Sequence, residues 1–314
     1  MTKNKVVIVG TGFVGMSYAY ALVNQGVVEE LVLIDANKEK AEGEAMDLNH
    51  GLAFTPRKMT IKARGYEECK DAGLVVITAG VNQKPGETRI DLLNRNAKII
   101  QSVTHNIMES GFNGIILVAS NPVDILAYVA WKESGLPTSR VFGSGTSLDT
   151  ARLRYEISKY IHIDARNIHA YILGEHGDSE FVCWSKAYVG TKPMLDVIES
   201  MKEIEFEDLD HIYLKVRDAA QEIIKRKNAT FYGIGMALVR ITNAIFDNEN
   251  SILPISVYND GVYNIDKDLY IGLPAVLNRD GVHHVVNLKL SQEEQVKLEK
   301  SAKILKESLK MMDL

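Results

Sequence analysis

Apolar and polar positions alternate along the first half of the chain in a pattern typical of buried strands joined by helices. Short apolar runs rich in β-branched residues predict strands at 5–9, 31–34, 74–78 and 115–119, with a further strand at 59–63. Stretches with helical spacing between them predict helices that end near Gly26 and that cover 38–48 and 123–131. Strands that alternate with helices indicate the α/β fold class, with a doubly wound parallel sheet of the Rossmann type.

The second half of the chain follows a less regular pattern. The alternation breaks near Ser144, and we place a domain boundary there, with 1–144 in the α/β domain and 145–314 in a second, α+β domain. Within the second domain we expect helices at 148–160, 208–225 and 232–246, and strands at 251–258, 268–278 and 281–288. Ser291-Gln292-Glu293-Glu294 has the sequence of a capping box. It predicts a final amphipathic helix whose apolar stripe is Leu298, Ala302, Leu305, Leu309 and Met312.

The composition excludes several classes of protein. A chain of 314 residues that is 46% hydrophobic can bury one large core or two packed ones. The net charge of −5 and the lack of a basic cluster argue against nucleic acid and anionic membranes as partners. Two cysteines, no visible export signal and apolar runs too short to span a bilayer lead us to expect a soluble protein of the cytoplasm.

A glycine-rich turn follows the first predicted strand. Gly10-Thr11-Gly12-Phe13-Val14-Gly15 is a GxGxxG sequence at the start of a helix, and the next strand ends in Asp35. Strand, glycine turn, helix, strand and terminal acid in this order predict a dinucleotide site. The glycines let the backbone approach a pyrophosphate at the positive end of the helix. Asp35 would accept hydrogen bonds from a ribose and repel a 2′-phosphate, which favours NAD over NADP.

Two segments follow predicted strands at the edge where parallel sheets bind ligands. Residues 79–89 form a long polar segment containing Pro85 and Gly86. We interpret it as a mobile loop that carries Arg89 towards a substrate, although a solvated loop without function fits the same pattern. Asn121-Pro122 predicts a tight turn, compatible with a cis bond, which presents the Asn121 amide to the crevice or serves only to form the turn.

His176 is the strongest candidate for acid/base chemistry. It lies in Gly174-Glu175-His176-Gly177 at the end of an apolar run, and histidine exchanges protons near neutral pH. Alone, this pattern favours a structural histidine over a catalytic one. Asp149 and Arg152 share one face of the predicted helix at 148–160, so they either pair with each other or serve a histidine and a ligand carboxylate respectively. The histidine spacings match no metal motif, so we predict no metal site.

Several of these segments, taken together and in order, closely resemble the bacterial L-lactate dehydrogenases of the lactate/malate dehydrogenase superfamily. The resemblance covers essentially the whole chain. It rests on the glycine turn at 10–15, Asn82-Gln83-Lys84-Pro85-Gly86-Glu87-Thr88-Arg89, Asn121-Pro122-Val123-Asp124, Leu148-Asp149-Thr150-Ala151-Arg152 and Gly174-Glu175-His176-Gly177. It implies reversible transfer of hydride between NADH and pyruvate to give L-lactate, in a cytoplasmic homotetramer of glycolysis and fermentation.

The resemblance also implies a role for each matching residue. His176 would be the proton donor and acceptor, Asp149 would orient its imidazole, and Arg152 would hold the substrate carboxylate. Further substrate contacts would come from Arg89 at the carbonyl, from the Asn121 amide, and from Thr230 at the methyl end of the pocket. Beyond the glycine turn and Asp35, the implied cofactor-binding residues are Val14, Lys40, Tyr66, Gly80, Val81, Ser102, Asn121 and Ser144.

Gln83 bears on the choice of substrate. Malate dehydrogenases place an arginine at the matching position, where it pairs with the second carboxylate of oxaloacetate. A neutral amide leaves that charge unpaired, which favours pyruvate. The alternatives are a malate or other 2-hydroxy acid dehydrogenase, and a non-catalytic NAD(H)-binding redox sensor. Retention of His176, Asp149, Arg152 and Arg89 disfavours the sensor.

Arg154 and His169 resemble the basic pair that binds fructose 1,6-bisphosphate between subunits in many bacterial members. Their resemblance predicts an allosteric enzyme that this bisphosphate activates. A surface arginine and an unremarkable strand histidine are the alternative interpretation. His169 precedes His176 on the same segment, so an effector bound there would act on the proton donor through a short stretch of backbone.

Overall fold

A nine-stranded sheet forms the centre of the computed structural model, which describes residues 4–82, 86–201 and 206–312. For Arg89 and Phe206 only the backbone is described. The strand order is β14-β13-β12-β6-β5-β4-β1-β2-β3. Pairing from β6 to β3 is parallel, through β1 (Lys5–Val9), β2 (Glu30–Ile34), β3 (Thr60–Ala63), β4 (Leu74–Ile77), β5 (Ile115–Val118) and β6 (Val141–Gly143). The predicted α/β fold with a parallel sheet is therefore confirmed.

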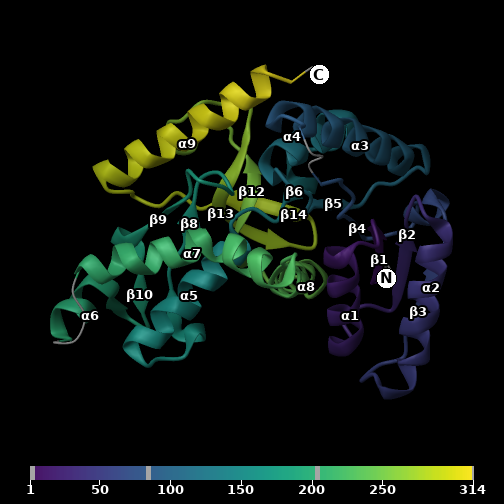
Figure 1. The fold of residues 1–314 in the computed structure, drawn as a ribbon, viewed down its shortest axis with the longest axis horizontal. Coiled ribbons are helices and arrows are strands. Elements are labelled where there is room, and N and C mark those ends of the chain that lie inside the picture. Colours follow the sequence, from purple (N-terminus) through teal and green to yellow (C-terminus); the bar gives the residue numbers. More distant parts are fainter. Residues whose placement is uncertain (1–3, 83–85, 202–205, 313–314) are drawn as a thin grey trace.

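Helices cover the parallel strands on both faces. They are α1 (Phe13–Gln25), α2 (Lys38–His50), α3 (Arg89–Glu109) and α4 (Val123–Ser134). Figure 1 shows β1 and β4 between α1 on one side and the α3–α4 pair on the other. Strands β1, β2, β4 and β5 are buried along their whole length, which explains why their sequences are continuous apolar runs.

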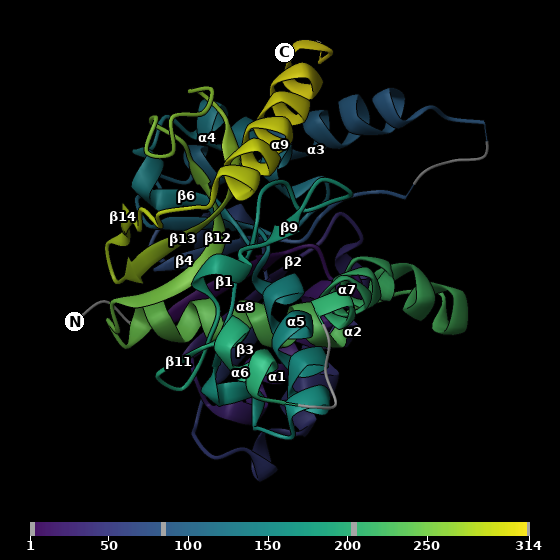
Figure 2. The ribbon, with the colours of Figure 1, turned by 90° about the vertical axis from the view of Figure 1, so that its left-hand side faces the viewer.

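The same sheet continues into the second half of the chain. Strands β12 (Ser251–Tyr258), β13 (Tyr270–Asn278) and β14 (Gly281–Val285) pair antiparallel and extend the sheet beyond β6 (Figure 2). Strand β12 joins β6 antiparallel, with Ser256 opposite Gly143. A Cβ at Gly143 would lie 3.0 Å from the Ser256 Cβ and 2.7 Å from a Val123 methyl. Glycine therefore permits this close approach.

The remaining elements of the second half surround a smaller apolar cluster and the far edge of the sheet. They are α5 (Ser147–Ile161), α6 (Met194–Ser200), α7 (Phe206–Lys227), α8 (Tyr232–Phe246), α9 (Gln292–Lys310), a sheet of β7 (Ile168–His169), β10 (Tyr188–Val189) and β11 (Lys192–Pro193), and the pair β8 (Ile172–Leu173) and β9 (Phe181–Val182). The capping box at Ser291 and Glu294 is confirmed. Of the predicted stripe, Leu298, Ala302 and Leu305 are buried on α9 and Leu309 is half-buried there, while Met312 is buried just beyond the end of the helix.

Several local features complete the comparison with the sequence. Helix α3 was not predicted, although Thr88 and Asp91 form a capping box at its start. The peptide bond before Pro122 is cis. Cys69 and Cys183 are both buried and free. Among the described residues, none of the helices combines the length and the hydropathy needed to cross a bilayer.

Candidate active site

The residues that follow β1, β4, β5 and β6 meet at one edge of the sheet because these strands are parallel. Hydrogen bonds join the strand ends there. Thr78 Oγ1 donates to Gly10 O at 2.7 Å, Ser120 Oγ donates to Ala79 O at 2.6 Å, and Ser144 N donates to Val118 O at 2.8 Å. This is the edge at which a doubly wound sheet binds its ligand.

The glycine turn packs too closely for side chains at two of its positions. A Cβ on Gly10, where φ is +108°, would lie 2.7 Å from Ala79 N, and a Cβ on Gly15 would lie 2.0 Å from Gly10 O. A Cβ on Gly12 would instead point into open space. Helix α1 starts at Gly12 without a side-chain cap, so the N–H groups of its first turn suit a phosphate.

Asp35 lies beside this turn and its carboxylate is held in the ionised form. Thr11 donates to Oδ2 through its backbone N–H at 2.7 Å and its hydroxyl at 2.8 Å, and Asn37 N donates to Oδ1 at 2.9 Å. Burial acts to raise the pKa of Asp35, but these bonds and the charge of Lys40 lower it overall. An anionic acceptor next to an uncapped helix end fits the adenosine half of NAD.

The other proposed cofactor residues occupy varied surroundings. Tyr66 lies near Asp35, whose charge contributes, after burial, to raising the tyrosine pKa. The Val81 N–H donates to Asn96 Oδ1 at 2.9 Å, and Asn96 Nδ2 donates back to Val81 O at 3.3 Å. Asn96, buried on α3, is thus a positioning residue that sequence reasoning missed. Ser102 is exposed on α3, Ser144 is buried after β6, and Val14 is half-buried in α1.

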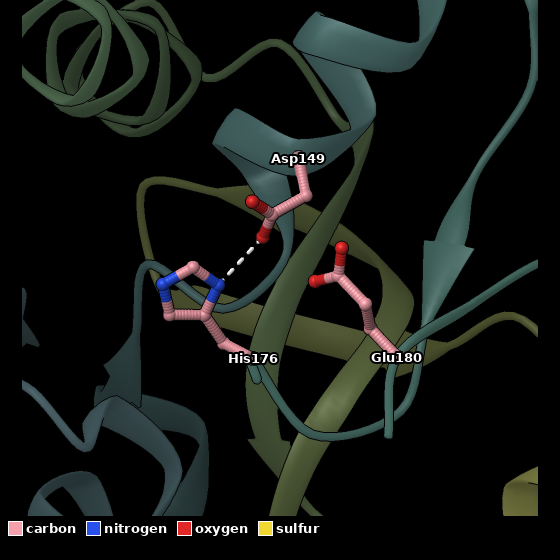
Figure 3. A group of neighbouring side chains, drawn as sticks. All are labelled: Asp149, His176 and Glu180. Atoms are coloured by element: carbon pink, nitrogen blue, oxygen red, sulfur yellow. Dashed lines mark hydrogen bonds and ion pairs between the residues drawn. The ribbon is translucent and has the colours of Figure 1, made fainter. Parts of the chain in front are cut away.

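His176, Asp149 and Arg152 come together at the start of α5. Figure 3 shows the His176 ring facing the Asp149 carboxylate, with Nδ1 2.6 Å from Oδ2. Arg152 Nη1 donates to the other oxygen, Oδ1, at 3.0 Å. The two interpretations of the Asp149–Arg152 spacing therefore do not exclude each other, because one carboxylate serves both cations.

The surroundings of His176 favour the imidazolium form. Burial lowers its pKa, but the charge and the hydrogen bond of Asp149 outweigh burial and raise it to about 9. The pKa of Asp149 is lowered despite its burial, chiefly by His176 and then by Arg152. A quarter of the His176 side chain remains exposed, and its second ring nitrogen points away from both acids (Figure 3). That nitrogen can donate a proton to a ligand.

Asp124 holds the backbone of His176 and was not singled out as a site residue from the sequence. It is buried in the first turn of α4, where its Oδ2 accepts the His176 N–H at 2.8 Å and its Oδ1 accepts Ser256 Oγ at 2.5 Å. Burial raises its pKa to about 6 against these two hydrogen bonds. Its place in Asn121-Pro122-Val123-Asp124 was the available signal.

Glu180 is a second acid that sequence reasoning missed. One of its carboxyl oxygens lies near Asp149 and His176 (Figure 3), and this oxygen, an Asp149 oxygen and a His176 ring nitrogen are all within 4.8 Å of one another. Residues of these types can ligate a metal ion, but here Asp149 is already hydrogen-bonded to His176 and Arg152. The absence of a metal site therefore stays a prediction.

The remaining predicted substrate residues are placed less fully. Gln83 lies outside the described residues, and Arg89 begins α3 with only its backbone described. Asn121 is exposed after β5, and Thr230 is half-buried between α7 and α8. Within the described part of the chain, the hydrogen bonds of His176 run to Asp149 and Asp124 and not to Asn121 or Thr230.

Arg154 and His169 lie on neighbouring segments. Arg154 Nε donates to Ala170 O at 3.4 Å, directly after His169, and its guanidinium lies 5.6 Å from the centre of the Tyr171 ring. His169 is exposed on β7, opposite Tyr188. Arg154 also lines a hollow between α5 and α8.

Comparisons with known proteins match this architecture along the whole chain. Residues 4–143 match the NAD binding domain of lactate/malate dehydrogenase, and residues 146–313 match the alpha/beta C-terminal domain of that family. The chain is 56% identical over 306 residues to L-lactate dehydrogenase 2 of Bacillus cereus, covering 98% of this chain and 97% of the relative. L-lactate dehydrogenase 1 of Bacillus anthracis is similar to the same degree.

Solved structures agree with the sequence relatives. A crystal structure of a lactate dehydrogenase enzyme from a Medee basin deep-sea metagenome library superposes with a TM-score of 0.99 at 76% identity, covering 100% of both chains. The minor L-lactate dehydrogenase of Enterococcus mundtii in its ligands-bound form gives 0.97 at 51% identity, covering 100% of both chains. Its ligands-unbound form gives 0.92 at 50% identity, covering 100% of this chain and 99% of the other.

Proposed function

Because the chain belongs to the lactate/malate dehydrogenase family, we propose that it is an NAD-dependent L-lactate dehydrogenase that reversibly reduces pyruvate to L-lactate. The observation that carries this proposal is the contact of His176 and Arg152 with one buried carboxylate, Asp149. A proton donor and a carboxylate-binding cation thus contact the two oxygens of the same side chain. Pyruvate offers a carbonyl oxygen and a carboxylate, the two groups that this pair can bind.

His176 gives its proton to the carbonyl oxygen of pyruvate and takes it back in the reverse direction. Bound NADH supplies the hydride that the keto carbon receives. Asp149 fixes the imidazole with Nδ1 towards itself and stabilises its charged form, which leaves the second ring nitrogen to face the substrate. One hydride and one proton convert pyruvate into L-lactate, so the reaction is balanced.

Other residues bind and orient the substrate. Arg152 holds the carboxylate in a two-pronged contact and so fixes which face of the keto carbon is presented. Arg89 polarises the carbonyl after the loop at 79–89 closes, Asn121 donates a further hydrogen bond, and Thr230 lines the methyl end. The neutral Gln83 leaves no partner for a second carboxylate and so favours pyruvate over oxaloacetate.

The first domain, 1–144, provides the NAD site, and 145–314 provides most of the catalytic residues. Gly10, Gly12 and Gly15 admit the pyrophosphate and Asp35 accepts the ribose hydroxyls. The fit of these residues to NAD is supported by the glycine contacts and the ionised Asp35 described above. The rest of the proposed set is Val14, Lys40, Tyr66, Gly80, Val81, Ser102, Asn121 and Ser144.

Regulation and assembly are further parts of the proposal. Arg154 and His169 bind fructose 1,6-bisphosphate between subunits of a cytoplasmic homotetramer, and the bisphosphate activates the enzyme. The Arg154–Ala170 hydrogen bond supports this part, because it places the guanidinium beside the segment that carries His169.

One assay tests the proposed function. The purified protein is mixed with NADH and, in turn, pyruvate, oxaloacetate and 2-ketoisocaproate, and the loss of NADH absorbance is followed. We expect the highest kcat/KM with pyruvate. A higher value with oxaloacetate or 2-ketoisocaproate would assign another 2-hydroxy acid, and no turnover with any of them would favour an NAD(H)-binding sensor.

A further inference from the structure

Glu180 is a buried acid to which the proposed reaction assigns no role. Only 5% of its surface is exposed. Its backbone N–H donates to Gly177 O at 3.1 Å, and its carbonyl accepts the Tyr213 hydroxyl of α7 at 2.5 Å. Figure 3 shows its side chain directed from the segment before β9 towards the Asp149–His176 pair. These bonds fix the backbone of Glu180 on both sides of its side chain.

The charges around Glu180 decide its protonation state. An ionised Glu180 would bring two buried carboxylates within 4.8 Å of each other, which like-charge repulsion opposes. Burial raises the pKa of Glu180, the charge of Asp149 raises it further, and His176 and Arg152 lower it by less. A neutral Glu180 leaves the cluster with the charges of His176 and Arg152 against that of Asp149. An ionised Glu180 would add a further negative charge beside the substrate carboxylate and repel it.

The remaining neighbours of Glu180 line a cavity of about 460 Å³ between its segment, α7 and α9. Among the described residues, no lysine or arginine forms an ion pair with Glu180, and Lys297 pairs instead with Glu293 at 2.5 Å. Acidic and basic groups are mixed around the cavity, so they supply no single counter-charge. They are Asp178 on the segment itself, Asp210 and Tyr213 on α7, and Glu293, Lys297 and Lys300 on α9.

We propose that Glu180 is a positioning residue whose protonated carboxyl donates a hydrogen bond to Asp149 and holds that carboxylate between His176 and Arg152. The proximity of the two carboxyl groups permits this contact, and Glu180 contributes to the lowered pKa of Asp149 after His176 and Arg152. The kinetic part of this proposal rests on the proposed function, because its readout is pyruvate reduction. The protonation of Glu180 is testable without any assay of activity.

The first experiment compares the thermal unfolding of the wild type and Glu180→Gln from pH 5 to pH 9. Folded wild type keeps a proton that the unfolded chain releases above the ordinary glutamate pKa, so rising pH destabilises it through this group. Glutamine carries no such proton. We therefore expect the Tm of Glu180→Gln minus that of wild type to increase steadily with pH. Glu293→Gln, exposed on the same cavity, should show no increase. A difference that stays constant or decreases for Glu180→Gln would overturn the proposal.

The second experiment measures pyruvate reduction across the same pH range. Glu180→Gln keeps a neutral donor, so kcat and KM should stay within about twofold of the wild-type values. The decline of kcat/KM at high pH should occur at the same pH as in wild type. Glu180→Leu removes the donor and should lower kcat about tenfold, the effect of losing a hydrogen bond to a charged group. If the decline of kcat/KM in Glu180→Gln moves to lower pH, Glu180 acts as an anion and the proposal is wrong. If folded Glu180→Leu has the wild-type kcat, Glu180 does not position Asp149. If wild type does not reduce pyruvate, the proposed function fails and the unfolding experiment still decides the protonation.

Discussion

The main-chain N–H of His176 donates a 2.8 Å hydrogen bond to Asp124, while its ring nitrogen Nδ1 lies 2.6 Å from Asp149. Two carboxylates from two helices, α4 and α5, therefore fix one histidine through its backbone and through its side chain. Ser256 on β12 holds the other oxygen of Asp124. The position of the proton donor thus depends on the strand that joins the second half of the chain to the parallel sheet.

Replacing Asp124 should weaken both folding and catalysis. Asp124→Ala leaves the His176 N–H and the buried Ser256 hydroxyl without their acceptor, and each such loss costs about 1–3 kcal/mol. Urea unfolding should show the lower stability, and pyruvate reduction should show a kcat lower by about tenfold or more. Ser256→Ala is the control, because it removes one donor and leaves the His176 bond intact. Wild-type kcat in folded Asp124→Ala would contradict a role in placing His176.

The pH dependence of the reaction should follow His176, whose pKa is about 9. Pyruvate reduction needs the protonated ring, so its kcat/KM should decline as pH rises through about 9. Lactate oxidation needs the neutral ring and should increase over the same range. Asp149→Asn removes the charge that does most to raise this pKa, so the decline should move to lower pH. If the pH profile of kcat/KM is unchanged in Asp149→Asn, a group other than His176 causes the decline.

Local patterns predicted the half of the site that binds the cofactor. The glycine turn and Asp35 are separated by one helix and one strand, so their spacing in sequence fixes their proximity. The alternating elements were predicted for the same reason. Helix α3 was missed although Thr88 and Asp91 carried its capping signal, because the polar segment before it was interpreted as a loop up to Arg89.

Contacts made only by tertiary packing were not predictable in this way. Asp124 lies 52 residues from His176, and nothing in the local sequence indicates that they bond. From its local sequence Glu180 resembles a surface acid, and only the packing of its segment against α7 buries it. The pairing of β12 with β6 also depends on Ser256 meeting Gly143, so the joining of the two halves into one sheet was missed.

Asp35 should determine the choice between NAD and NADP. Asp35→Ser removes the acceptor of the ribose hydroxyls and the charge that repels a 2′-phosphate. We expect the KM for NADH to rise about tenfold, and the NADPH to NADH ratio of kcat/KM to rise by more than that. Glu39→Gln, which neutralises an exposed acid in the first turn of α2, should leave the ratio unchanged. If Asp35→Ser and wild type have the same NADPH to NADH ratio of kcat/KM, Asp35 does not contact the ribose.

The bisphosphate site should be visible in pyruvate saturation curves. Fructose 1,6-bisphosphate should move the wild-type curve to lower pyruvate concentration, because it binds the active assembly more tightly. Replacing Arg154 and His169 together by glutamine should abolish that shift and leave kcat at saturating pyruvate unchanged. Lys192→Gln, an exposed change on β11 at the other edge of the small sheet that contains His169, should keep the shift. Absence of a shift in wild type would refute activation.

Gln83→Arg should change the preferred substrate from pyruvate towards oxaloacetate. The two keto acids differ by a second carboxylate, and a cation at this position can form a charge-assisted pair with it, whereas the amide of Gln83 cannot. The pyruvate to oxaloacetate ratio of kcat/KM should therefore fall by about tenfold or more. Gln83→Met provides the matched control, because it changes the side chain without adding charge and should not favour oxaloacetate. Because Asp149, Arg152 and His176 are unchanged, the lower kcat/KM of Gln83→Arg with pyruvate should come from a higher KM and not from slower proton transfer. Equal ratios in Gln83→Arg and wild type would show that another residue selects the substrate.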